Sequence, residues 1–270
     1  MRFVAIPLLV VAVLAEDSSY VRDIEQYRAQ REASLKQDDG WLSVVGLFRL
    51  KQGVNRIGAA EIDDIALPAS APAHFGTITL AGDRVSYNGT QLRPDVDIIR
   101  TGTVSFFVIK RGNEHFIRVK DNDSKIRRDF TGLKWFPIDA SWNIAAKFTP
   151  YDEPRIMMFD SQNGVKQTMR SPGYITFVRD GKEYRLEPVW EEEQLFFIFR
   201  DATSNRSTYG AARFLYAAPA KDGTVVLDFN KAINPPCAFT PYATCPLPPP
   251  QNRLTLAVTA GEKKYSDAIE

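Results

Sequence analysis

The amino-acid sequence predicts an all-β fold, an antiparallel sandwich or a partly open barrel, with a short N-terminal helix in front of it. Beyond Gly40, short runs of β-branched and aromatic residues alternate with clusters of Gly, Pro, Asn and Asp. Tight-turn pairs such as Asp180-Gly181 and Asp222-Gly223 join neighbouring runs, and such pairs favour two-residue hairpin turns. Regular short strands joined by tight turns are typical of antiparallel sandwiches and barrels.

The expected strands follow one another from the middle of the chain to its C-terminal region. The clearest are 105–110, 115–120, 142–148, 155–159, 174–178, 183–188, 195–199, 213–216, 224–228 and 253–258. The segment 17–37 differs, because it is rich in charges and places Val21, Ile24 and Leu35 near helical spacing. It is expected to form one amphipathic helix that packs its apolar stripe on the sheet.

The beginning of the chain has the pattern of a secretory signal peptide. Arg2 is followed by an apolar run that ends at Leu14, and Ala15 completes a small-residue cleavage site before Glu16. The apolar run is shorter than the about 20 residues that a membrane-spanning helix needs. We therefore expect a signal peptide at 1–15, a single β-rich domain at 16–270, and a secreted or periplasmic protein without stable membrane insertion after cleavage.

The composition excludes partners that require a strong charge of one sign. The chain has 34 Lys and Arg residues and 33 Asp and Glu residues, and removal of Arg2 with the signal peptide balances the two. A balanced charge gives no electrostatic basis for binding nucleic acid or an anionic membrane surface. Hydrophobic residues make up 44% of the chain and charged residues 25%, as in ordinary soluble globular proteins.

The most informative segment is the Pro-rich loop, by which we mean residues 228–253. It contains both cysteines of the chain and a large share of its 17 prolines. Proline fixes φ and removes a backbone donor, so this segment can form neither a helix nor an interior strand. Apolar residues such as Phe229, Phe239 and Leu247 are interleaved with its polar residues, which favours an ordered loop over a disordered one. The loop is therefore expected to present a rigid polar cluster.

Sequence motifs in and around this loop resemble those of the DUF1684 family. The loop reads D-F-N-K-A-I-N-P-P-C-A-F-T-P-Y-A-T-C-P-L-P-P-P-Q-N-R, and A-G-E-K follows at 260–263. Upstream, the resemblance includes G-W-L-S-V-V-G-L-F-R-L at 40–50, V-K-D at 119–121 and R-D-A-T-S-N-R-S-T-Y-G-A-A-R-F-L-Y at 200–216. It extends over nearly all of the chain after the signal peptide. The resemblance implies no activity, because the family is defined as one of unknown function.

A second resemblance concerns residues 46–92, whose motifs are similar in order to the core of a forkhead-associated (FHA) domain. The matching residues include Gly58, His74 and the turn at 88–90. Ala59 stands where that family has an arginine, and 71–73 lack the Ser and Arg expected before the histidine. The resemblance implies an FHA-like subunit without phosphothreonine recognition, which needs those donors. The main sheet and the Pro-rich loop would then occupy 93–270.

Cys237 and Cys245 are expected to form a disulfide. Seven residues separate them, and an exported protein matures in an oxidising compartment. Two alternatives stay open, namely free thiols and a metal site that also uses His74 and His115. Zinc sites of that kind usually space their cysteines two to four positions apart, so neither a metal nor another cofactor is expected.

Common catalytic motifs are absent from the sequence. It contains no G-x-S-x-G elbow, P-loop, H-E-x-x-H or C-x-x-C pattern, and a Ser-His-Asp triad would have to use one of only 2 histidines. Three polar segments remain, near 118–127, 201–213 and 228–253. Segments that connect strands can meet at one end of a sandwich or barrel and form a pocket there.

We hypothesise that the protein binds a small polar or anionic ligand in a pocket formed by the Pro-rich loop. The expected ligand-binding residues are Arg118, Asp121, Arg213, Asn230, Asn234, Asn252 and Arg253, because guanidinium groups favour carboxylates and phosphates. The alternative is a hydrolase that uses Asp228 or Asp201 as general base, with an arginine or Tyr209 stabilising developing charge. A third reading is that these side chains only brace the loops, as buried Asp, Asn and Arg often do.

Overall fold

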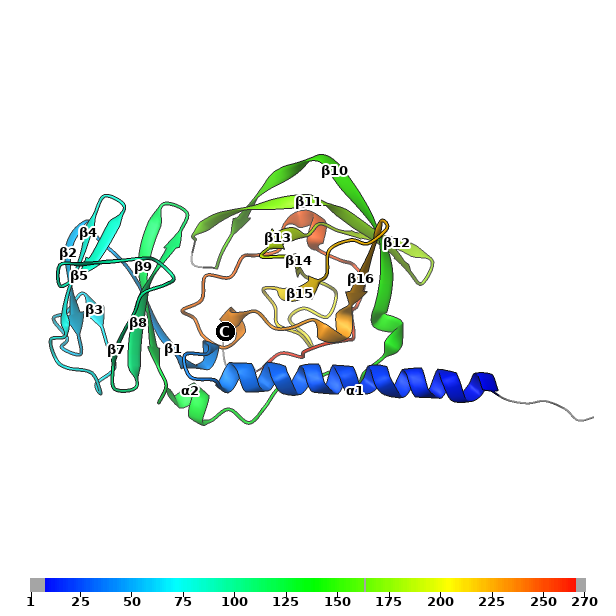
Figure 1. Ribbon diagram of the computed structural model, residues 1–270, viewed down its shortest axis with the longest axis horizontal. Coiled ribbons are helices and arrows are strands. Elements are labelled where there is room, and N and C mark those ends of the chain that lie inside the picture. Colours follow the sequence, from blue (N-terminus) through cyan, green and yellow to red (C-terminus); the bar gives the residue numbers. More distant parts are fainter. Residues whose placement is uncertain (1–7, 163, 266–270) are drawn as a thin grey trace, which may run out of the picture.

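The protein folds into two β-rich lobes, and a long N-terminal helix runs along the C-terminal lobe, with its C-terminal end toward the other lobe (Figure 1). The computed structural model describes residues 8–162 and 164–265. We call 44–121 the N-lobe and 143–262 the C-lobe. The strands of both lobes pair antiparallel, except for one short parallel pair between β2 and β3. The predicted all-β class with an N-terminal helix is thereby confirmed.

The N-lobe consists of two sheets that enclose one hydrophobic core. One sheet has the order β1 (Val44–Arg49), β9 (Glu114–Asp121), β8 (Val104–Arg111) and β7 (Ile98–Thr101). The other has the order β3 (Ile65–Ala66), β2 (Gly53–Gly58), β4 (Gly76–Ala81), β5 (Arg84–Tyr87) and β6 (Thr90–Leu92). Ile57 and Ile78 of the second sheet pack in the same core as Val108 and Val119 of the first. The segment 46–92 therefore shares its core with strands that follow it in the chain.

The C-lobe also contains two sheets, and the smaller one is buried on both faces. The larger sheet has the order β12 (Lys182–Leu186), β11 (Lys166–Arg179), β10 (Asn143–Asp160) and β16 (Thr224–Asp228). The smaller has the order β13 (Val189–Glu191), β14 (Gln194–Phe199) and β15 (Arg213–Ala217). Phe197 packs in a core with residues of β11 and β16, whereas its neighbour Phe196 packs in a second core with Cys237 and Cys245. The Pro-rich loop thus covers the second face of the smaller sheet.

The C-lobe strands differ from the expected ones in two respects. The expected strands 142–148 and 155–159 belong to one strand of 18 residues, β10, whose pairing with β11 shifts register between Pro150 and Arg155. The expected strand 253–258 forms no ladder, although Leu254, Leu256 and Val258 are buried in strict alternation. Its backbone is extended and bonds to the 200–202 segment, for example from Leu254 N to the carbonyl of Arg200 at 2.8 Å. The alternating pattern of apolar residues therefore predicted which side chains of 253–258 are buried. It did not predict that this segment bonds to the 200–202 segment.

Two of the predicted hairpin turns have the left-handed backbone conformation that their Asp-Gly sequences favour. Asp180 and Gly181 have φ values of 52° and 74°, and Asp222 and Gly223 have φ values of 50° and 71°. Two successive positive φ values define the type I′ turn, which suits the right-handed twist of antiparallel strands. These turns join β11 to β12 and lead from β15 into β16.

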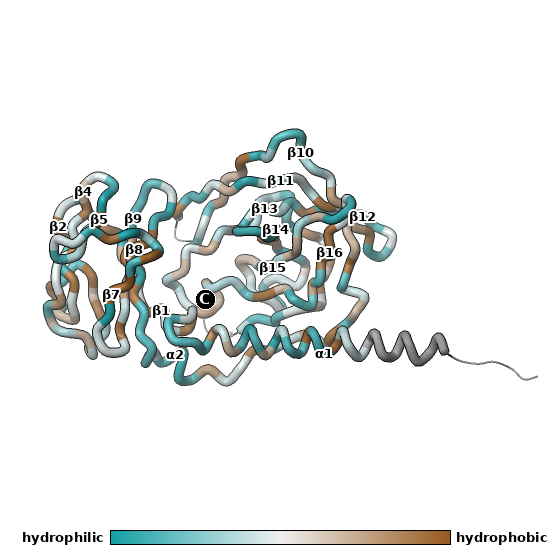
Figure 2. Tube along the Cα trace, viewed as in Figure 1, coloured by the Kyte–Doolittle hydropathy of each residue, from teal (hydrophilic) through white to brown (hydrophobic). Residues whose placement is uncertain are grey.

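The N-terminal helix is longer than expected. α1 spans Leu8–Lys36, so it continues through the predicted cleavage site after Ala15; residues 1–7 of the predicted signal peptide lie outside the described part of the chain. Its described surface is mostly hydrophilic, with only a few hydrophobic residues interspersed (Figure 2). Within the described residues, no helix has the length and apolar character that crossing a membrane requires.

One face of α1 holds the helix against the C-lobe. Ile24 and Leu35 are buried at 0% and 1% exposure, in agreement with the predicted stripe. Polar side chains on the same face bond to the C-lobe and to the segment before it: Tyr27 Oη donates to the carbonyl of Lys231 at 3.0 Å, and Arg28 Nη2 donates to the carbonyl of Phe136 at 2.9 Å. The helix therefore docks through hydrogen bonds as well as through its narrow apolar stripe.

Short helical turns complete the fold. They are η1 (Trp41–Ser43) after α1, α2 (Lys125–Arg128) and η2 (Ala140–Trp142) between the lobes, and η3 (Phe229–Lys231), η4 (Pro236–Ala238) and η5 (Pro250–Asn252) in the Pro-rich loop. The loop is thus compact and ordered, as its composition predicted. η1 carries Trp41 into the space between the lobes, where the candidate site is found.

Candidate ligand-binding cavity

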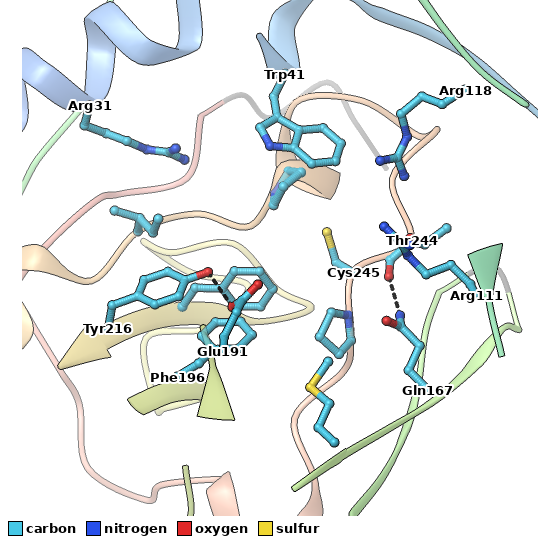
Figure 3. A pocket seen from close by; sticks show the side chains of 15 residues that line it. Arg31, Trp41, Arg111, Arg118, Gln167, Glu191, Phe196, Tyr216, Thr244 and Cys245 are labelled. Atoms are coloured by element: carbon cyan, nitrogen blue, oxygen red, sulfur yellow. Dashed lines mark hydrogen bonds between the residues drawn. The ribbon is translucent and has the colours of Figure 1, made fainter. Parts of the chain in front are cut away.

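A cavity of about 360 Å³ lies where the two lobes, α1 and the Pro-rich loop meet (Figure 3). This volume falls in the range of small-molecule sites. Arg111 and Arg118 come from the N-lobe, Trp41 from η1 and Arg31 from α1. The remaining wall belongs to the C-lobe and consists of Gln167, Met169, Glu191, Phe196, Phe214, Tyr216, Ile233, Pro236, Thr244, Cys245 and Pro246. The cavity therefore exists only when both lobes are in place.

Arg118 is a buried cation without a counter-ion. It lies on the central strand β9, between Leu47 of β1 and Phe107 of β8, and only 4% of its surface is exposed. Its Nε and Nη2 atoms are buried and have no hydrogen-bond partner among the described residues. The guanidinium carbon lies 4.9 Å from the ring centroid of Trp41, which provides a cation–π contact. A buried charge normally needs a partner, and Arg118 has no ion pair among the described residues.

Burial also changes the ionisation of Arg118. Desolvation lowers its pKa to about 10, and the positive charge of Arg111 lowers it further in the same direction. At neutral pH the guanidinium remains charged, because this pKa is still well above 7. A bound anion would reverse both effects, since it would replace lost solvation and offset the neighbouring charge.

The other two arginines of the cavity already have partners. Arg31 Nε donates to Glu262 Oε1 at 2.9 Å, and its Nη2 donates to the carbonyl of Asn234 at 3.1 Å. Arg111 Nη1 donates to the carbonyl of Lys110 at 2.8 Å and lies 3.7 Å from Asp95 Oδ2. Arg118 is therefore the one of these three arginines without an ion pair among the described residues.

The C-lobe wall combines aromatic surface with one carboxylate. Tyr216 stacks on Phe196 with ring centroids 4.7 Å apart, and Phe214 packs edge-on against Phe196 at 4.8 Å. Tyr216 Oη donates to Glu191 Oε2 at 3.0 Å. Partial burial raises the pKa of Glu191, and the charge of Glu192 adds to this rise. Figure 3 shows Glu191 and Tyr216 across the cavity from Arg118 and Arg111.

The Pro-rich loop supplies the edge of the cavity through Pro236 and the 244–246 segment. Gln167 of β11 fixes this edge, because its Nε2 donates to the carbonyl of Thr244 at 2.8 Å. The backbone amide of Leu247 donates to the carbonyl of Asp160 at 2.7 Å and attaches the loop to β10. The Pro-rich loop therefore lines one edge of the cavity.

The structure corrects the predicted disulfide, because Cys237 and Cys245 are both free and buried. Their sulfur atoms interact through hydrogen bonding instead of a covalent bond. The backbone amide of Cys237 also donates to Cys245 Sγ at 3.3 Å. The thiol–thiol hydrogen bond lowers the pKa of Cys237 and raises that of Cys245. The loop owes its order to backbone and side-chain hydrogen bonds.

A second cavity of about 460 Å³ is also lined by Trp41. It shares Arg31, Trp41 and Arg118 with the first and adds Lys120, whose pKa is lowered mainly by burial. Lys120 Nζ donates to the backbone carbonyl of Asp39. Trp41 and Arg118 therefore form a common wall between two cavities.

Asp201 and Arg213, two of the predicted site residues, lie in the C-lobe interior, away from the cavity. Asp201 Oδ2 accepts from Arg213 Nη1 at 3.0 Å, and its Oδ1 accepts from the amide of Thr203 at 2.7 Å. Arg213 also donates to the carbonyls of Val258 and Ala260. The pair ties the 201–208 segment to the C-terminal segment, and both Nη atoms of Arg213 are bonded within the protein, whereas its Nε has no partner among the described residues.

Asp228 and Asn230 lie together at the junction of β16, η3 and α1. Asp228 Oδ1 accepts from Tyr20 Oη at 2.8 Å and from the amide of Asn230 at 3.1 Å. Asn230 Nδ2 donates to the carbonyl of Asp139 at 2.8 Å. This cluster caps η3 and anchors the helix, and it does not line the cavity.

The other predicted residues are distributed over several places. Asn252 bonds to the backbone of Glu187 and Ile198, and Asn234 bonds to Glu262 and Lys263. Asp121 accepts from the amide of Asp123 at 2.9 Å in the turn after β9. Arg253 is exposed, and Tyr209 Oη donates to the carbonyl of Cys237 at 3.1 Å. Of the predicted set, Arg118 is the member that lines the cavity.

Sequence reasoning did not single out Trp41, Arg111, Glu191 or Tyr216 as site residues. Trp41 belongs to the G-W-L-S-V-V-G motif noted above, so attention to a conspicuous tryptophan before the first strand would have found it. Glu191 lies among three successive glutamates that read as a solvated turn. Its orientation depends on the hydrogen bond from Tyr216, and no local sequence pattern shows that these two residues are neighbours.

The described residues do not bring three or more His, Cys, Asp or Glu side chains together as a metal site would require. His74 is exposed beside Asp63 and His115 lies on β9 near Asp83, so neither joins the cysteine pair in the described structure. The metal alternative for Cys237 and Cys245 has no geometric basis there.

One comparison with known proteins, the match to a family model, covers the Pro-rich loop. A solution NMR structure of an uncharacterized protein from Haloarcula marismortui is 32% identical, with 53% of this chain and 81% of that chain covered and a TM-score of 0.44. Comparison with curated proteins gives no match. Residues 128–263, half of the chain, match the model of a family described as "Protein of unknown function (DUF1684)". This chain is accordingly a member of the DUF1684 family.

Proposed function

We propose that the protein binds a small organic anion in the cavity between its lobes, with Arg118 as the anion-binding group. The observation that supports this most strongly is the buried guanidinium with two unpartnered nitrogens. An unpaired buried charge lowers the free energy of unfolding. Binding sites commonly contain residues that lower stability in this way, because function requires them. Phe196 and Tyr216 offer apolar surface beside the anion site, which favours an organic anion over a bare inorganic one.

The hydrolase alternative receives no support from the same contacts. Asp201 and Asp228 were its candidate general bases, and both carboxylates accept several hydrogen bonds at positions outside the cavity. Tyr209, its candidate for charge stabilisation, donates to the carbonyl of Cys237. A general base must lie within hydrogen-bond reach of its substrate, so we propose binding.

We also propose that the protein acts outside the cytoplasm after removal of residues 1–15. Tyr20, Tyr27 and Arg31 dock α1 on the C-lobe and all lie beyond Ala15, so cleavage after Ala15 would leave these contacts intact. The intact mass of the protein recovered from an exporting host tests this, and a mass that includes Met1 would contradict it.

Titration calorimetry with short-chain carboxylates and inorganic phosphate tests the binding proposal. Arg118→Met keeps an unbranched side chain against Trp41 but removes the charge. We expect it to weaken anion binding by about 10- to 100-fold, because hydrogen bonds to charged groups contribute about 1.5–3 kcal/mol. Arg253→Met is the matched control, since Arg253 is exposed and lies outside the cavity.

Stability measurements on the same variants distinguish a binding arginine from a structural one. Arg118→Met removes an unpaired buried charge, so the free energy of unfolding should stay the same or increase. A clear loss of stability together with unchanged anion affinity would show that Arg118 serves the fold, and the proposal would be wrong.

A further inference from the structure

We infer that the ligand is dipolar: a small organic acid that also carries an amino group, with its anion at Arg118 and its ammonium at Glu191. This inference rests on the proposed function, because it assumes that Arg118 binds the anion. It adds Glu191 as the residue that determines which anions are preferred. The supporting observations are the arrangement of charges around the cavity and the surface between them.

The cavity has one uncompensated charge of each sign on separate walls. Arg118 belongs to the N-lobe and has no ion pair among the described residues, whereas Arg31 and Arg111 pair with Glu262 and Asp95. Glu191, the one carboxylate in the cavity wall, has no ion pair in the described structure either. Figure 3 places the two on opposite sides of the open volume.

Neither a simple anion nor a dianion fits this arrangement well. A monocarboxylate would neutralise Arg118 but would leave Glu191, whose side chain is exposed at the cavity wall, without a counter-charge and beside a second negative charge, that of Glu192. A dianion would bring its second negative charge toward Glu191, and like charges repel. An ammonium group at Glu191 removes both problems, because it supplies the missing counter-charge.

Glu191 is held in a fixed orientation for such a contact. Its Oε2 accepts from Tyr216 Oη at 3.0 Å, and the Tyr216 ring is stacked on Phe196 with an interplanar angle of 9°. This contact uses one lone pair of one oxygen, and a carboxylate has about four acceptor sites. The rest of the carboxylate can therefore accept from a ligand without losing its orienting bond.

The surface between the two charges is apolar. Phe196, Phe214 and Ile233 line the cavity beside Tyr216, so the body that connects the acid and the amine should be hydrocarbon. The polar groups at the two ends would fix orientation, and the apolar body would contribute affinity by leaving water. Amino acids with an aliphatic chain between the two groups have this construction.

The probes that test the inference are straight-chain ω-amino acids of roughly four to eight carbons, a size suited to a cavity of this class. Each is compared with the carboxylic acid and the alkylamine of the same chain length by titration calorimetry at neutral pH. We expect the amino acid of the best length to bind at least about tenfold tighter than its carboxylic acid, which corresponds to about 1.4 kcal/mol.

Glu191→Gln is the decisive variant, because it keeps the size of the side chain and removes its charge. We expect it to abolish the preference for the amino acid while the carboxylic acid binds as well as before or better. Glu193→Gln is the matched control, since Glu193 is an exposed neighbour outside the cavity. Arg118→Met should weaken both ligands. If Glu191→Gln disturbed folding, circular dichroism of the variant would reveal it, and the pH dependence of the wild-type protein would then decide.

That pH dependence has a defined sign. The pKa of Glu191 is raised, and only its ionised form attracts an ammonium group. The preference for the amino acid should therefore be complete above this pKa and disappear as the pH falls through it, with the ligand carboxylate still ionised for part of that range.

The outcomes separate the inference from the proposed function. If the carboxylic acid binds through Arg118 at least as tightly as the amino acid, the inference is wrong and the proposed function stands. The same holds if Glu191→Gln retains the preference. If no carboxylate binds to the wild-type protein, both fail.

Discussion

Asp201 and Arg213 form an ion pair at 3.0 Å in which the two side chains are 0% and 1% exposed. Arg118 is nearly as buried but has no such partner. The two arginines therefore represent opposite uses of a buried guanidinium. Arg213 is ion-paired and braces the C-lobe through its two Nη atoms, whereas Arg118 lines a cavity without an ion pair among the described residues.

The first prediction concerns the braced arginine. Asp201→Asn keeps the shape of the side chain but leaves the Arg213 charge unpaired in the interior. Breaking a buried ion pair in this way costs about 3–5 kcal/mol, and we expect a loss in that range in urea unfolding. Asp222→Asn in an exposed hairpin turn should change little. A loss below about 1 kcal/mol would contradict the bracing role.

The second prediction concerns Asp228, which was a candidate catalytic residue. Asp228→Asn weakens the bonds from Tyr20 and from the amide of Asn230, so the free energy of unfolding should fall by about 1–3 kcal/mol. Anion affinity should not change, because Asp228 does not line the cavity. Unchanged stability with lost binding, measured on the same sample, would restore Asp228 to the functional site.

The third prediction concerns the acid side of the stability profile. The pKa of Asp39 is lowered, first by its hydrogen bond from Arg100 and then by Ser105 Oγ, which donates to Oδ1 at 2.9 Å. A lowered folded-state pKa gives stability that is present above the unfolded pKa of about 3.9 and is lost as the pH falls through the folded value. The wild-type protein should therefore lose this contribution below about pH 4.

Asp39→Asn tests this without disturbing the backbone. Asp39 has a φ of 59°, and Asn tolerates this left-handed conformation as well as Asp does. The variant should be less stable than wild type at pH 7, and the difference should shrink as the pH is lowered toward 3 in parallel urea titrations. Asp222→Asn, at a φ of 50°, controls for the substitution itself. A difference that stays constant with pH would rule out the electrostatic explanation.

The fourth prediction concerns the cysteines. Because Cys237 and Cys245 are free in the structure, a thiol reagent should find two thiols per chain in protein that is denatured without reductant. The hydrogen bond that lowers the pKa of Cys237 makes its thiolate the more readily formed of the two. Absence of titratable thiols would show that the pair oxidises in the isolated protein.

Local patterns in the sequence were sufficient for the fold class. Alternation predicted the buried face of the extended 253–258 segment, and Asp-Gly pairs predicted the turns at 180–181 and 222–223. These features depend on neighbouring residues alone. The length of β10 and the pairing of 253–258 with the 200–202 segment depend on long-range contacts, and no local signal contains them.

The candidate site was harder to predict from the sequence than the fold class, because it too depends on contacts between distant residues. A high density of Asp, Asn and Arg arises both in binding sites and in loops that need hydrogen bonds to close. Asp201, Asn230 and Asn252 belong to the second kind. Arg118 differs from the bracing arginines only in its surroundings. A sequence shows that an arginine lies on a strand, but it does not show whether the side chain faces a carboxylate or a cavity.

The family match includes one wall of the cavity but not the other. Glu191, Tyr216 and the Pro-rich loop lie within residues 128–263, whereas Trp41 and Arg118 precede that segment. The wall with Glu191 and Tyr216 therefore belongs to the segment that defines the family match, whereas the wall with Trp41 and Arg118 lies outside that segment.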